Sequence, residues 1–236
     1  FFAPLKSSLV LSEGTGSPIF TRATKAWGLN ELGILRDVPS GCAVLEGARL
    51  VKNTIRTTSE DFSNASAWNK TGSLTTPSAN SLVCANATSA QYIGQVAVSP
   101  PPTTIGQGFI YGVRVRSVSG GVPAIQLAPS SLGFGTGQFA NISLTDGSVS
   151  ATGCTAVSNL VAAGTYDFAI AVTATANHAT GEAFSIVLAD SKAATRLAAF
   201  TGDGIKSVDI LRAWSIEVTG YPSSYAPEYV SVGSSV

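Results

Sequence analysis

Apolar and polar residues alternate with a period of two through much of the chain after about residue 81. In residues 109–116 the odd positions are apolar, and the even positions include Arg114 and Arg116. Because a strand places successive side chains on opposite faces of its sheet, this pattern predicts strands with one face in a core. The same alternation recurs in residues 166–173 and 208–218. The 24 glycines and 11 prolines in 236 residues also leave little room for long helices.

Shorter runs between turn residues bring the count to roughly nine strands, the spacing expected of an all-β sandwich. The additional predicted strands cover residues 91–98, 123–127, 139–144, 148–152, 183–189 and 196–200. Asp146-Gly147 separates two of them and is a dipeptide that accepts positive φ in a tight hairpin. Residues 190–199 are rich in alanine, but we expect a loop there that leads into a strand.

The first sixty residues have no clean alternation. Their one helical candidate, residues 26–35, is interrupted by Gly28 and Gly33. We therefore expect an extended N-terminal arm over residues 1–60, with short strands or a single helical turn, before a sandwich over residues 61–236. The chain has no methionine, and its start lacks the charged and apolar regions of a secretory signal. Processing of the chain, or residues ahead of its start, would account for this.

Charge excludes several classes of protein. Fourteen basic and fourteen acidic side chains give a net charge of zero, and the charged fraction is only 12%, about half the usual ~25%. No basic cluster is present, so we expect no nucleic-acid partner, because such binding depends on clustered cations. The apolar runs are shorter than the ~18 residues that a membrane-spanning helix needs. We expect no membrane span.

Few residues offer catalytic or metal-binding chemistry. The single histidine, His178, lies in a polar loop, and no G-x-S-x-G motif is present, so a serine nucleophile would lack its base. Most carboxylates stand in turns, where aspartate bonds its own backbone. Neither His pairs nor a calcium-loop motif occurs. We expect no enzymatic activity, no cofactor and no metal site; a structural calcium ion at the Asp203 turn is the alternative.

The three cysteines, Cys42, Cys84 and Cys154, are widely spaced and odd in number. This spacing fits neither a disulfide framework nor a C-x-x-C site. We expect buried free thiols, with a Cys84–Cys154 disulfide as the alternative.

Glycan binding requires less: an aromatic platform and several hydrogen-bonding side chains on a shallow surface. Four outward-facing polar side chains lie on the predicted strands near residues 91–98 and 107–118: Gln91, Gln95, Arg114 and Arg116. If those two strands pair, the four side chains line one sheet face as ligand-binding residues. The alternative is that they are ordinary solvated positions or subunit contacts.

Two tryptophans bear on the same question. Trp68 follows an Asp-Phe-Ser-Asn turn and is either an exposed platform for a ligand or a structural plug at the sandwich edge. Trp214 shares the parity of Ile210 and Ile216, which predicts a place in the core.

Residues 53–72 read N-T-I-R-T-T-S-E-D-F-S-N-A-S-A-W-N-K-T-G. They resemble the S-E-D-F-S-N-A-x-W-x-K segment that opens a carbohydrate-binding-module-like jelly roll in virion proteins of tailed bacteriophages. Further elements similar to that family follow one another in order through residues 17–227: F-T-R-A-T at 20–24, E-G-A-R at 46–49, L-T-D-G-S-V at 144–149, T-G-D-G at 201–204 and Y-P-S-S-Y-A-P at 221–227. The chain departs from the family at 213–216 and 166–168, where Trp-Gly-Ala-Gln and a Trp-Tyr-Arg strand would stand.

The resemblance implies a jelly-roll β-sandwich and a non-enzymatic role on the virion surface. The expected function is capsid decoration or a head fibre that stabilises the shell and contacts glycans. The alternatives are a tail-fibre or receptor-binding protein that recognises host glycans, a glycan-binding module of a polysaccharide-active enzyme, and a glucanase-like sandwich enzyme. The implied partners are major capsid or tail proteins, a cell-surface glycan and further copies of the chain, as a homotrimer.

Overall fold

The computed structural model describes residues 26–29, 35–38, 59–95, 103–179 and 183–218. The chain divides into two compact units, Phe1–Val51 and Lys52–Val236. In the first unit, β1 (Ala26–Leu29) and β2 (Leu35–Val38) pair antiparallel, with Ala26 opposite Val38. The segment expected to hold short strands or a helical turn therefore holds two short strands. Nearly all of the rest of the predicted arm lies outside the described residues.

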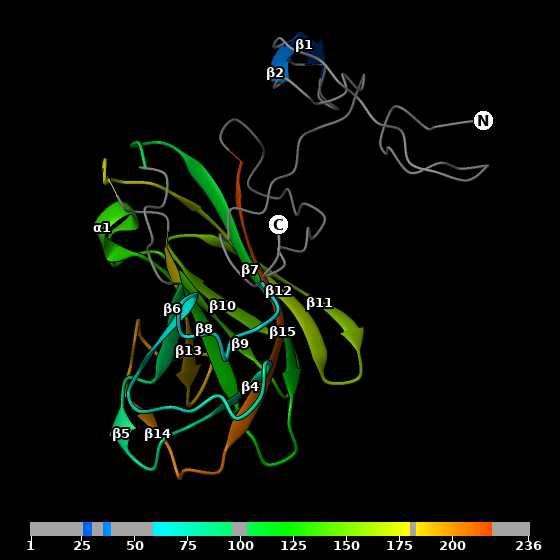
Figure 1. Cartoon of the computed structure of the whole chain (residues 1–236), viewed down its shortest axis with the longest axis vertical. Coiled ribbons are helices and arrows are strands. Elements are labelled where there is room, and N and C mark those ends of the chain that lie inside the picture. Colours follow the sequence, from blue (N-terminus) through cyan, green and yellow to red (C-terminus); the bar gives the residue numbers. More distant parts are fainter. Residues whose placement is uncertain (1–25, 30–34, 39–58, 96–102, 180–182, 219–236) are drawn as a thin grey trace, which may run out of the picture. The chain divides into compact units, whose positions relative to one another are not determined.

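The second unit is a sandwich of two antiparallel sheets (Figure 1). Within the described residues, one sheet has six strands in the order β10-β9-β8-β13-β6-β3. Their bounds are β3 (Trp68–Thr71), β6 (Tyr92–Gln95), β8 (Ala124–Pro129), β9 (Phe139–Ser143), β10 (Val149–Thr152) and β13 (Phe184–Ala189). The position of β13 between β8 and β6 shows that sheet neighbours are far apart in sequence.

The other sheet, again counted over the described residues, has five strands in the order β11-β12-β7-β15-β4. Their bounds are β4 (Ser81–Val83), β7 (Gly108–Ser117), β11 (Thr155–Ala162), β12 (Thr165–Thr173) and β15 (Ser207–Glu217). The described part of the unit also contains a small pair, β5 (Thr88–Ser89) with β14 (Phe200–Thr201), and one turn of helix, α1 (Ser131–Phe134). The chain crosses repeatedly between the sheets, and the predicted all-β sandwich is confirmed.

The core lies between the inner faces of the two sheets. The ring of Tyr111 in β7 stacks on that of Phe184 in β13, with 4.8 Å between centroids. Alternate residues of β7 and β12, including Val113 and Phe168, are fully buried in the same cluster. The alternation in the sequence is therefore the inside–outside pattern of sandwich strands.

The hairpin prediction at residues 146–147 is confirmed: Gly147 has φ +71° between β9 and β10. The strand predicted over 196–200 is wrong except at its end, because only Phe200–Thr201 is extended. Residues 190–199 form the expected loop. The prediction missed β3, β4, β5, β11 and α1. Strand β11 gave no alternating signal because it lies at a sheet edge, with exposed side chains on both faces.

Candidate functional site on the outer face of the five-stranded sheet

The four polar residues predicted to line one sheet face are separated. Residues of β6 belong to the six-stranded sheet and those of β7 to the five-stranded sheet. The pairing on which the prediction depended is therefore absent from the described strands. Arg114 and Arg116 share one face of β7, whereas Gln95 is in β6 of the other sheet and Gln91 directly precedes β6.

Trp68 is fully buried. Its ring lies 4.8 Å from that of Phe62 and meets Phe184 edge-on at 6.2 Å. Of the two alternatives for this tryptophan, the structural plug is therefore confirmed and the exposed platform is wrong.

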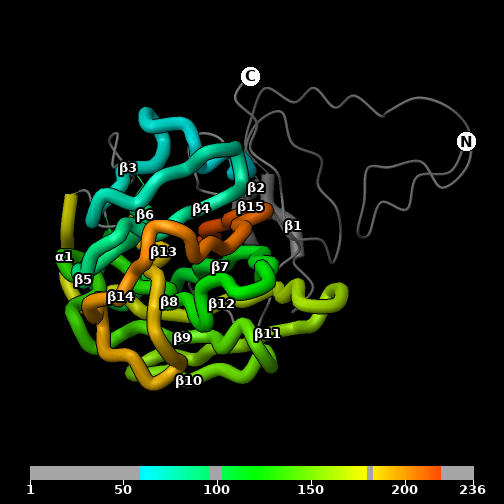
Figure 2. Tube along the Cα trace, turned by 90° about the horizontal axis from the view of Figure 1, so that it is seen from below, coloured from blue at the N-terminus to red at the C-terminus, as the bar shows by residue number. Residues whose placement is uncertain are grey.

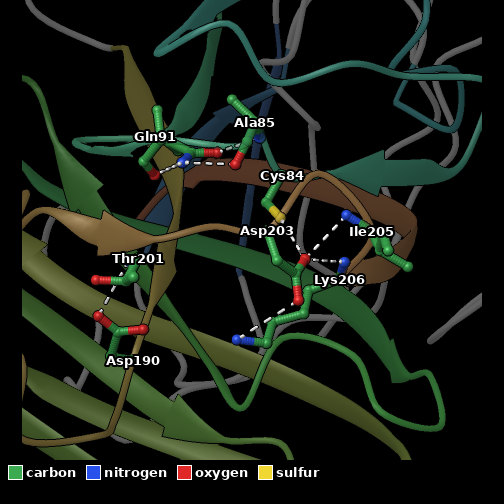
Figure 3. Close-up of polar contacts among 9 residues, drawn as sticks. Cys84, Ala85, Gln91, Asp190, Thr201, Asp203, Ile205 and Lys206 are labelled. Atoms are coloured by element: carbon green, nitrogen blue, oxygen red, sulfur yellow. Dashed lines mark hydrogen bonds and ion pairs between the residues drawn. The ribbon is translucent and has the colours of Figure 1, made fainter.

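Gln91 is also fully buried and serves as a clamp for the neighbouring loop (Figure 3). The N–H of Ala85 donates to its Oε1 at 2.7 Å, and its Nε2 donates to the carbonyl of Ala87 at 3.0 Å. The amide thereby satisfies backbone groups of a loop that precedes β5. Gln95 is opposite Trp68 in the pairing of β3 with β6 and so shares the inward face, with its Oε1 buried and without a hydrogen-bond partner among the described residues.

Arg114 lies on the outer face of the five-stranded sheet, where the register places it between Asp167 of β12 and Arg212 of β15. Its Nε and Nη2 each donate to one oxygen of Asp167 at 2.7 Å, a bidentate ion pair. Arg212 donates to the same carboxylate at 3.4 Å. The hydrogen bonds to Asp167 raise the pKa of Arg114. One carboxylate thus links three neighbouring strands.

Arg116 forms a second ion pair one step along the strand. Its Nε and Nη2 donate to one oxygen of Asp209 at 3.1 and 2.7 Å. The Arg116 side chain is 54% exposed, compared with 25% for Arg114. Arg116 is therefore the more accessible donor of the two.

Trp214 is buried, as predicted, but it lies on this same outer face and not in the core cluster that contains Ile210. The register between β15 and β7 shifts between Ile210 and Arg212, and this bulge reverses the parity of the residues that follow. Trp214 is opposite Gly112, and Arg212 stands over its ring at 5.8 Å. Only 6% of Trp214 is exposed, so the ring offers no open platform to a sugar.

The 190–199 loop lies over β8 and β9 on the outer face of the six-stranded sheet. Two buried amides fasten the loop, Gln126 in β8 and Asn141 in β9, which bond each other at 2.8 Å. Gln126 accepts from the N–H of Leu197 at 2.8 Å, and Asn141 donates to the carbonyl of Ala194 at 2.8 Å. Sequence reasoning missed both amides because they occupy strand positions without any motif.

The Asp203 carboxylate accepts hydrogen bonds from the backbone of the turn that it begins (Figure 3). Its Oδ1 accepts from the N–H groups of Ile205 and Lys206 at 2.9 and 2.8 Å, and these bonds lower its pKa. Cys84 Sγ donates to the same oxygen at 3.5 Å. Across the described residues, no group of three or more His, Cys, Asp or Glu side chains is placed to hold a metal ion. The turn-forming role is thus the one that the contacts support.

Cys84 and Cys154 are both free, so the alternative of a disulfide between them is wrong. Cys84 is buried and Cys154 half-buried, and burial raises the pKa of the Cys154 thiol. Cys42 lies outside the described residues. His178 is half-buried, and its backbone pairs with that of Thr103.

A shallow hollow of about 460 Å³ lies beside α1. Its lining residues are uncharged: Phe134, Gly135, Gly137, Gln138, Gly153, Thr173 and Thr175. The Gln138 amide is already engaged, because it donates to the Thr173 carbonyl at 2.7 Å and accepts from the Thr173 N–H at 2.9 Å. The described lining therefore includes no ionisable side chain that could act as an acid or base beside its threonine hydroxyls.

Compared with models of known protein families and with curated proteins, the chain matches none. Among the described residues, no helix has the length and apolarity needed to cross a membrane.

Proposed function

We propose that this chain is a non-enzymatic structural protein on the outside of a tailed-phage particle, where it decorates the capsid or forms a short head fibre and stabilises the shell. The kind of particle is proposed from the ordered motifs in residues 17–227. The observation that carries the structural role is that the polar groups of the sheet faces bond to one another. Polar groups that are already bonded to one another stabilise the domain and are not available to bind a ligand.

The ion pairs on the five-stranded sheet support this role. The Asp167 carboxylate is occupied by Arg114 and Arg212, and Asp209 is occupied by Arg116. Glycoside hydrolysis needs one carboxyl free to donate a proton and another free to act as base or nucleophile. Neither carboxylate has that freedom while it is held by arginine, which favours support over catalysis.

The division of the chain supports a separate anchor. Residues Phe1–Val51 form their own compact unit, distinct from the unit that contains the sandwich. We propose that this first unit contacts the major capsid protein and that the sandwich contacts the surroundings. A tail-fibre role would use the same division with a tail protein as partner.

In this proposal Arg116 is the residue that contacts a glycan. Its guanidinium is the most exposed of those in the two described ion-pair groups and retains donor capacity beyond Asp209. An Arg116→Ala variant would then lose binding on a glycan array, whereas Arg212→Ala, which changes a less exposed side chain, would keep more of it. Equal binding by the wild type and both variants would remove Arg116 from this role.

The proposal is tested by quantitative mass spectrometry of purified particles whose genome encodes this chain. Decoration of the head predicts a fixed ratio of this chain to the major capsid protein, repeated at every capsomere. A few copies per particle would favour the tail-fibre alternative. Absence of the chain from purified particles would contradict a virion role. It would favour the alternative that the chain is a glycan-binding module of a polysaccharide-active enzyme.

A further inference from the structure

Strand β11 is an edge of the five-stranded sheet and pairs only with β12 among the described strands (Figure 1). It runs for 8 residues, Thr155–Ala162, longer than the 4-residue β10 at the corresponding edge of the other sheet. Its apolar side chains reach solvent: Val157 is 38% exposed, Leu160 68% and Val161 45%. One side of this strand therefore presents unpaired backbone groups beside exposed apolar side chains.

The usual protections of an edge strand are nearly absent here. Natural edges are blocked by charged residues, prolines, short length or bulges. Residues 147–166 contain neither a charge nor a proline. The one such feature is a register shift between Leu160 and Ala162, at the end of the strand. Residues 155–160 are left as a straight, uncharged edge.

The edge of the second sheet adds to this surface. Strand β10 ends at Thr152 and β11 begins at Thr155, and the two lie side by side in the view from below (Figure 2). Together they form one wall of the sandwich whose two strands contain no charged residue, with Lys192 Nζ donating to Ser148 Oγ at 2.7 Å just before β10. With 8 residues at ~3.4 Å each, β11 offers a partner strand an edge about 27 Å long.

We propose that a second copy of this chain covers this wall, with β11 of each copy pairing antiparallel about a twofold axis to join two five-stranded sheets into one. In such an isologous contact residue i of one copy faces residue j of the other and j faces i, so a charge near the axis would lie close to its own copy in the partner. The absence of charge from 147 to 166 removes that penalty in every register.

The nearest charge on the neighbouring strand, Asp167, is neutralised within its own copy by Arg114. A polar or charged peptide from another protein would gain no charge complement here, which favours self-association. This inference goes beyond the proposed function, since location on a particle does not require a twofold contact.

The first test is the mass of the full chain in solution by light scattering coupled to size exclusion. The expected mass is twice the chain mass of 24.0 kDa or an even multiple of it. A mass of one chain at high concentration, or an odd multiple such as a trimer, would overturn the twofold pairing.

The second test places charge on the wall. Val157→Lys/Leu160→Lys puts like charges near each other across the axis and is expected to halve the mass while leaving the circular dichroism spectrum unchanged. The matched control Leu132→Lys/Ile205→Lys changes two side chains that are 59% and 81% exposed elsewhere, and it should keep the wild-type mass. An unchanged mass in the first variant, or an equal loss in the control, would overturn the proposal.

Hydrogen exchange tests the β11 pairing in the wild-type protein, without any substitution. In the wild type at high concentration, alternate amides of residues 155–160 are expected to exchange more slowly than upon dilution below the dissociation constant. The amides of β3, at an edge of the other sheet, serve as the internal reference and should not change. Exchange in β11 as fast as that of a solvent-exposed edge at every concentration would contradict the pairing.

Discussion

The indole ring of Trp214 lies across the backbone of Gly112, so closely that a Cβ at residue 112 would be 2.1 Å from indole Cε2. The two residues are opposite each other in the register of β15 with β7, on the face that points away from the core. The absence of a side chain at residue 112 is what allows the ring to lie against the sheet. This contact also fixes the ring beneath Arg212.

Gly112→Ala is expected to destabilise the protein by about 1–3 kcal/mol, because the added methyl group displaces a ring in a packed setting. The measurement is the free energy of unfolding in urea. Gly137→Ala is the control, since a Cβ there meets no heavy atom within 4 Å, and its effect should stay within about 0.5 kcal/mol. Equal effects of the two substitutions would contradict the close packing.

Asp167→Asn is expected to cost about 1–3 kcal/mol of stability, because two arginines that are each roughly one-quarter exposed lose their shared carboxylate. Asp209→Asn should cost less than about 1 kcal/mol, because its partner Arg116 is 54% exposed and remains hydrated. Both are measured by urea unfolding at low ionic strength. A larger loss at Asp209 would contradict the assignment of Asp167 as the link between strands.

The sequence predicted the sandwich and the places of most strands, because burial of one face imposes a period of two. It could not assign strands to sheets. Gln95 and Arg114 both look outward by local alternation, yet β6 and β7 lie in different sheets and the glutamine faces inward. A single bulge near Arg212 likewise reversed the parity that had placed Trp214 in the core.

Gln91→Leu and Gln95→Leu are expected to have unequal effects, although both residues were predicted as ligand contacts. Loss of the Gln91 amide leaves the part-buried N–H of Ala85 unpaired and should cost about 1–3 kcal/mol. Gln95→Leu removes an oxygen that is buried without a partner among the described residues, and its effect should be below about 1 kcal/mol or stabilising. Thermal unfolding of the two variants gives the comparison. Equal losses of stability would contradict the role of Gln91 in holding the loop at Ala85.

The residues of the candidate site could be predicted only in part, because some of their roles depend on contacts between distant segments. Side-chain amides that fasten loops, such as Gln126 and Asn141, carry no motif and look like ordinary strand residues. Their role depends on the 190–199 loop folding over the sheet. Contacts between segments so far apart in sequence follow from the assembled fold and not from local pattern.

Acid should weaken the turn at Asp203. Amide bonds from Ile205 and Lys206 hold the pKa of this carboxyl below its ordinary value of 3.8 in the folded state. Its contribution is therefore complete above the unfolded pKa and is lost as pH falls through the lower folded pKa. The melting temperature of Asp203→Asn should lie below that of the wild type at about pH 6, and the gap should close toward about pH 2. A gap that does not change with pH would contradict the charged form of the carboxylate as the stabilising one.

The most direct test of the proposed function is a density map of the intact particle, into which the sandwich of residues 59–218 is fitted. The account predicts copies of the sandwich outside the head, repeated over the capsid lattice, with the first unit of the chain against the major capsid protein. Sandwich density confined to the tail, or missing from the particle, would contradict it.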